Sequence, residues 1–152
     1  MDFVFALHSH LPWVLHHGRW PHGSDWLTEA AVDTYLPLVE ALEGLQHEGV
    51  AAPVTLGVTP ILANQLAHPS FRTELAAFLT QRLQAAGDDI ATFTAGGDDE
   101  LARLASFWKS RYARLERTFA RLDGDIIGAL RRFEDAGRIE ICLLYTSPSP
   151  RD

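Results

Sequence analysis

The chain has 152 residues, 47% of them hydrophobic, which is enough for one domain with a buried core, and its net charge of -7 disfavours nucleic acids and membranes as partners. Its single cysteine, Cys142, excludes an internal disulfide and a thiolate zinc site. The apolar runs are shorter than the roughly 20 residues of a membrane span, and Met1–Phe3 lacks the basic region of a secretory signal, so we expect a cytoplasmic protein.

The first third of the chain predicts two strands joined by a loop and a helix. Phe3–Leu7 is a short apolar run typical of a strand that is buried on both faces, and Pro12–Asp25 predicts a long loop. A helical period begins at Thr28 and ends before Gly49. Pro37 is expected to start a second helical segment or to kink the first. Val54–Val58 predicts the second buried strand.

Helical patterns dominate the next part of the chain, up to a third strand at Ile139–Ile141. Strands separated by long helical excursions are typical of an α/β fold with parallel strands and right-handed crossovers. So few strands predict the opening part of a larger domain. The expected helices cover Ile61–Ala67, Ser70–Ala85, Glu100–Leu122 and Asp125–Ala136, with a break at Gly96–Asp99.

The last eleven residues, Cys142–Asp152, differ in character from the rest of the chain. Two prolines stand two residues apart where a buried strand should continue. Read back into codons, the segment resembles one frame of an adapter used in transposon-based DNA library preparation. We therefore expect residues 1–141 to be an incomplete part of a catalytic domain and residues 142–152 to be a non-native tail.

Two histidines, His8 and His10, lie at the end of the first predicted strand and are expected to point to the same side. Such a pair could bind a divalent metal ion, donate hydrogen bonds to sugar hydroxyls, or make structural hydrogen bonds. The pair alone does not favour one of these. Three tryptophans in the following loop, Trp13, Trp20 and Trp26, favour a carbohydrate cleft, because aromatic rings stack on the apolar faces of sugars.

Several motifs resemble the amino-terminal part of the family 57 glycoside hydrolases, and within them the 1,4-alpha-glucan branching enzymes. In chain order they are FALHSHLPWV, Trp20-Pro21, TYLPL from Thr34, TLGVTPILANQL from Thr55, and GRIEI from Gly137. The resemblance implies a distorted (β/α)7 barrel with long helical excursions between its parallel strands. It implies cleavage of an alpha-1,4-glucan such as glycogen or amylose and rejoining through an alpha-1,6 bond, by two carboxylates and without a cofactor or a metal.

The family motif that contains the two histidines maps onto His8 and His10, and we expect these residues with Trp13 and Trp20 to bind the glucan substrate. The nucleophilic glutamate and the acid/base aspartate of the family lie on later strands, beyond Ile141. Glu140 is interpreted as polar support inside the barrel. The acidic residues at 98–100 are interpreted as a solvated helix start. We therefore nominate no catalytic residue and expect the chain to be inactive as it stands.

Three alternative functions stay open at this point. An alpha-amylase or 4-alpha-glucanotransferase of the same family differs from a branching enzyme only in features that this sequence does not reveal. A metal-dependent barrel hydrolase would use His8 and His10 as ligands. A small non-enzymatic helical interaction module would unfold cooperatively at this length, whereas an open part of a barrel should expose its sheet edge and aggregate. The oligomeric state is not predicted.

Overall fold

The computed structural model describes residues 5–20, 23–50 and 54–142, and strands and helices alternate along them as the sequence predicts. The first two residues of the expected strand Phe3–Leu7, and the tail after Cys142, lie outside the described residues. In chain order the elements are β1 (Phe5–Ser9), α1 (Ser24–Ala30), the π-helical turn η1 (Ala31–Tyr35), α2 (Leu36–His47), β2 (Val54–Val58), α3 (Pro60–Ala67), α4 (Pro69–Gly96), α5 (Asp99–Arg121), α6 (Ile126–Asp135) and β3 (Ile139–Cys142).

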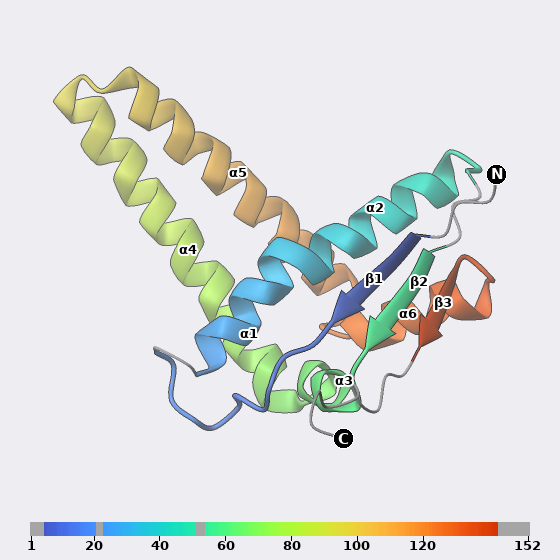
Figure 1. Ribbon diagram of the computed structural model, residues 1–152. Helices are drawn as coiled ribbons and strands as arrows, with labels where there is room; N and C mark the ends of the chain where they lie inside the picture. The colour runs from blue at the N-terminus through green and yellow to red at the C-terminus, as the bar shows by residue number, and fades with distance from the viewer. Residues whose placement is uncertain (1–4, 21–22, 51–53, 143–152) are drawn as a thin grey trace.

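In the described part of the chain, β1, β2 and β3 form one parallel sheet in the order β1-β2-β3 (Figure 1). Leu7 is in register with Leu56, and Leu56 is in register with Ile141. The prediction of parallel strands linked by helices is confirmed. Cys142, which we assigned to the tail, is the last residue of β3 and is in register with Gly57.

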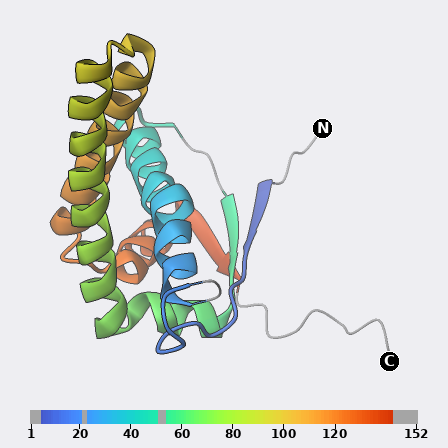
Figure 2. The same ribbon diagram turned by 90° about the vertical axis from the view of Figure 1, so that its left-hand side faces the viewer.

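The described helices lie on one face of the sheet, which leaves its other face open (Figure 2). Leu56, Val58 and Ile139 point into the core on the helical side and are buried. The side chains that alternate with them, such as His8 and Glu140, are exposed. The expectation that the first strand is buried on both faces is therefore wrong for this chain, because no described element covers the second face.

The helix expected from Thr28 begins earlier, at Ser24, so the loop before it is shorter than predicted. It runs through η1 into α2 and ends close to Gly49, which has φ +69°. The N–H of Leu36 bonds to the carbonyl of Ala31, five residues back, just before Pro37. A widened turn relieves the clash between a proline ring and the preceding turn. The expectation that a second helical segment starts near Pro37 is confirmed, because α2 begins at Leu36.

Helices α4 and α5 form a long antiparallel hairpin whose tip extends away from the sheet (Figure 1). The expected helix end at Ala85 is wrong, because α4 continues to Gly96 and ends with Gly97 in the left-handed conformation, at φ +77°. Near the sheet the hairpin is part of the core, where Phe71 and Leu115 are fully buried. At the outer end of the predicted apolar stripe of α5, Leu104 stays 53% exposed.

At the tip of the hairpin, α5 begins at Asp99 and exposed acidic side chains surround its start, as expected. The carboxylate of Asp125, the residue before α6, accepts a hydrogen bond from the N–H of Gly128 at 2.9 Å and so caps the start of that helix.

Within the described ranges, no helix combines the length and the apolar character that crossing a membrane requires.

Candidate functional site

The carboxyl ends of β1, β2 and β3 lie at the same edge of the sheet, where the arrows of Figure 1 point. Ser9 and Val58 are paired there, and so are Gly57 and Cys142. In parallel α/β sheets this edge is where ligands bind, because the loops that follow the strands meet there. The predicted site residues His8 and His10 lie at this edge.

Ser9 fixes the orientation of β1 by bonding to a residue of the helical layer. Its hydroxyl donates to the Tyr35 hydroxyl at 2.8 Å. Burial raises the pKa of Tyr35 above its ordinary value, and the hydrogen bond from Ser9 lowers it by a smaller amount. Because neighbouring side chains on a strand point to opposite faces, Ser9 faces the helices and His8 faces the open side of the sheet.

His8 is exposed and lies beside a position of the central strand, β2, that carries no side chain. Its register partner on β2 is Gly57, which is in turn paired with Cys142 on β3. Gly57 is buried and separates His8 from Cys142 on this face. One row earlier on the same face, the Thr55 hydroxyl donates to the Glu140 carboxylate at 3.1 Å. The open face thus carries a histidine and a carboxylate from different strands.

His10 follows β1 and lies against the start of α3. Its Nδ1 is 3.4 Å from Oγ1 of Thr59, which also accepts a hydrogen bond from the N–H of Leu62 at 3.4 Å. The Thr59 N–H donates to the carbonyl of Ser9 at 3.3 Å, so the turns after β1 and β2 are joined. The structure therefore brings His8 and His10 to one edge, as predicted, and both are exposed to solvent.

Gln65 on α3 holds the loop that follows His10, although we did not single it out from the sequence. Its side chain is fully buried; Oε1 accepts from the N–H of Val14 at 2.7 Å, and Nε2 donates to the carbonyl of Pro12 at 3.0 Å. The signal in the sequence was a polar residue at a position of the helix Ile61–Ala67 that its period places in the core.

Trp13 is held in this same loop and is 42% exposed. Its indole N–H donates to the carbonyl of Leu15 at 3.0 Å, and its ring meets the edge of His68 at a centroid distance of 6.3 Å. His16 packs against the other side of the same cluster, 5.5 Å from His68. Trp13 therefore offers a half-exposed ring in a pinned loop, three residues after His10 in the chain.

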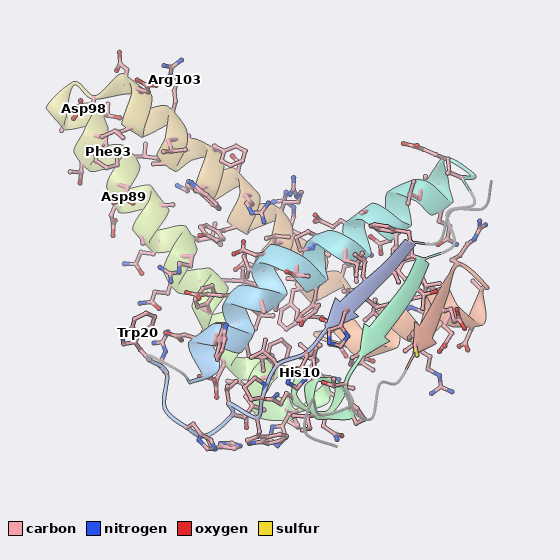
Figure 3. All side chains as sticks on the ribbon, in the orientation of Figure 1. His10, Trp20, Asp89, Phe93, Asp98 and Arg103 are labelled. Carbon is pink, nitrogen blue, oxygen red and sulfur yellow. The ribbon has the colours of Figure 1, made fainter. Side chains whose placement is uncertain are left out.

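Trp20 is 79% exposed and lies far from His10 in Figure 3. The structure therefore does not bring Trp20 together with the histidine pair. Asp98, one of the acidic residues expected at a solvated helix start, lies at the hairpin tip, also far from His10 (Figure 3). No group of three or more histidine, cysteine or acidic side chains in the described ranges is arranged to hold a metal ion.

No protein-family model matches the chain. Among curated proteins, the chain is 34% identical over 138 residues to the 1,4-alpha-glucan branching enzyme of Thermococcus kodakarensis, a match that takes in 91% of this chain and 20% of that enzyme. The crystal structure of the same enzyme, in complex with glucose and additives, matches with a TM-score of 0.85 at 32% identity. That match covers 92% of this chain and 24% of the solved one.

A second solved structure, the GH57-type branching enzyme from the archaeon Pyrococcus horikoshii, matches with a TM-score of 0.88 at 31% identity, over 92% of this chain and 26% of that one. An alpha-amylase from Thermotoga maritima shares the fold at 22% identity, with a TM-score of 0.80 over 92% of this chain and 26% of that one. Over most of its length the chain is therefore homologous to the family 57 branching enzymes, and it spans only about a fifth to a quarter of theirs.

Proposed function

We propose that the chain forms one part of a branching enzyme that cleaves an alpha-1,4-glucan and rejoins the cut segment through an alpha-1,6 bond. The observation that carries the proposal is the position of His8 and His10 at the carboxyl ends of parallel strands, in a fold matched to a GH57-type branching enzyme with a TM-score of 0.88. In this proposal the chain supplies one wall of the glucan cleft.

The role of each residue in this wall follows from its chemistry. His8 faces the open side of the sheet, where its imidazole can donate a hydrogen bond to a sugar hydroxyl. His10 is oriented by Thr59, and Trp13 offers a half-exposed ring on which the apolar face of a glucose unit can stack. Glu140 is held by Thr55 and supports the open face without a part in bond cleavage.

We further propose that the open sheet is part of a (β/α)7 barrel. The open face, which carries His8 and the Thr55–Glu140 pair, would then line the barrel interior. Two features support this: the helices of the described residues cover one face of the sheet, and the open face carries polar side chains such as His8, Thr55 and Glu140. Residues 1–141 belong to this domain in our proposal, and residues 142–152 are a non-native tail.

One experiment tests the strand-end site directly. We expect the purified chain to bind maltoheptaose, and replacement of both His8 and His10 with alanine to weaken binding by about fivefold or more, since each imidazole loses a hydrogen bond. His47→Ala is the matched control, because His47 is an exposed histidine at the end of α2. Equal affinities of the double variant and the control, measured by isothermal titration, would contradict the proposed site.

A second experiment tests the absence of a catalytic pair. The chain incubated with amylose should form no alpha-1,6 branches, because we assign it neither the nucleophile nor the acid/base. Branch formation by the purified chain would overturn this assignment.

Sequencing the source DNA across the codon of Ile141 tests the domain boundary. A reading frame that continues into further strands after Ile141 would support the proposal that residues 142–152 are not native.

A further inference from the structure

A pocket of about 400 Å³ lies between α4 and the segment that connects β1 to α1, away from the strand ends. Four of the polar side chains that line it are Arg19, Asp25, Glu74 and Gln81. Phe78 and Ala77 of α4 give the pocket a partly apolar wall. The volume is within the range of about 300–1,000 Å³ that is typical of small-molecule sites.

The polar groups of this pocket are held in position by bonds to one another. Arg19 Nε donates to Asp25 Oδ1 at 2.9 Å, and Arg19 Nη2 donates to Gln81 Oε1 at 3.4 Å. The N–H of Ser24 donates to the carbonyl of Gly18 at 2.9 Å, which closes the loop that carries Arg19. A side chain at Gly23 would collide with the Gly18 carbonyl, so this closure requires a glycine.

The pocket offers both donors and acceptors to a neutral polar ligand. The amide nitrogen of Gln81 is a donor, because the amide oxygen already accepts from Arg19. Glu74 Oε2 is an acceptor; it is shielded from solvent and has no hydrogen-bond partner among the described residues. The positive charge of Arg19 is paired with Asp25, which disfavours an anion such as phosphate. Alternating donors and acceptors beside an apolar wall match the vicinal hydroxyls and the C–H face of a sugar.

Trp20 adds the aromatic surface that such a site needs. It directly follows Arg19, which lines the pocket, and is 79% exposed. A ring exposed to this extent contributes little to the core, so it is free to stack on a sugar.

We propose that this pocket, with Trp20 at its margin, is a second glucan-binding site that holds a glucose unit of the substrate chain away from the strand ends. The proposal rests on the proposed function for the nature of the ligand. Two sites on one polymer raise its effective concentration at the first site, so a long glucan should bind more tightly than a short one. The pocket would thus favour polymers as substrates over free oligosaccharides.

The test follows the amide and indole N–H signals of the isotopically labelled 152-residue chain by NMR while maltoheptaose is added. The Trp20 indole and the Gln81 side-chain amide report on the pocket, and the Trp13 indole reports on the strand ends. We expect the Trp20 and Trp13 signals both to shift, with separate Kd values. Gln81→Ala should raise the Kd at Trp20 by about threefold or more and leave that at Trp13 unchanged.

The matched control is Gln84→Ala, an exposed glutamine of the same helix that does not line the pocket, and it should change neither Kd. A shift at Trp13 without one at Trp20 would overturn the second site and leave the proposed function in place. A shift at Trp20 alone would support the second site and contradict the strand-end assignment. The second site would also be overturned if neither indole signal shifts, or if the Gln81 and Gln84 variants change the Kd at Trp20 equally.

Discussion

Replacing Gln65 with methionine removes the two hydrogen bonds that hold the loop after β1 while keeping a side chain of similar length. The Gln65 side chain is fully buried, and Val14, whose N–H it accepts, is 2% exposed. Water therefore cannot easily replace the lost amide. The variant leaves the Val14 N–H and the Pro12 carbonyl without their partner.

The loss of stability in Gln65→Met follows from the Val14 N–H and the Pro12 carbonyl, the two backbone groups that lose their partner. A buried polar group left without a partner costs about 1–3 kcal/mol, so the pair costs about 2–6 kcal/mol. The apolar methionine side chain recovers about 1–2 kcal/mol by filling the same space. The difference between these two ranges is about 0–5 kcal/mol, and we expect the free energy of unfolding to fall by the central value of about 2.5 kcal/mol, which is a large share of the stability of a domain of this size.

The assay is urea-induced unfolding followed by far-ultraviolet circular dichroism, with Asn64→Met as the control. Asn64 is the exposed neighbour of Gln65 on the same helix, so its replacement tests the chemistry of the substitution without the loop contacts. Hydrogen exchange of the Val14 amide should also accelerate in Gln65→Met. A difference from the control of less than about 0.5 kcal/mol would refute the assigned role of Gln65 in holding the loop.

Three further changes test other parts of the fold. Gly97→Ala should destabilise the chain by about 1 kcal/mol in urea unfolding, because Gly97 has φ +77°, whereas Gly96→Ala within α4 should cost nothing. Burial raises the pKa of Tyr35 above its ordinary value of 10.0, so the stability that the neutral phenol contributes is complete below about pH 10 and is lost as the pH rises through the raised pKa; Tyr35→Phe should abolish this loss of stability above about pH 10. Asp125→Ala should lower the melting temperature by removing a helix cap worth about 1 kcal/mol, and Asp135→Ala at the other end of α6 should not.

The sequence predicted most of the elements because their periods are clear and their ends carry turn residues. Gly49, Asp99 and Asp125 each mark a helix boundary close to the expected position. The end of α4 was missed because Gly87 and the two aspartates after it disfavour a helix locally. Packing of α4 along α5 outweighs that preference, and local propensity contains no information on such a partner.

The candidate site could be predicted only where residues lie close in sequence. His8 and His10 reach the same edge because both are fixed by the end of one strand. Trp20 was grouped with them because it is near in sequence, but the loop turns away and places Trp20 far from His10 (Figure 3). The role of Gln65 depends on a contact between α3 and a loop some 50 positions earlier, which no local period reveals.

The wide π-helical turn at Ala31–Tyr35 joins α1 to α2 and determines which side chains of α2 face the core. It holds one residue more per turn than a regular helix, and each residue of an α-helix rotates the chain by about 100°. Deleting a single residue there would convert the wide turn into a regular helical turn and keep Val39 and Leu42 of α2 in the core. The same deletion within α2 would rotate the residues that follow it by about 100° and turn buried side chains toward solvent. The same deletion in the turn at Gly49 would only shorten a connection, so the tolerance of this helix to lost residues should change abruptly along its length.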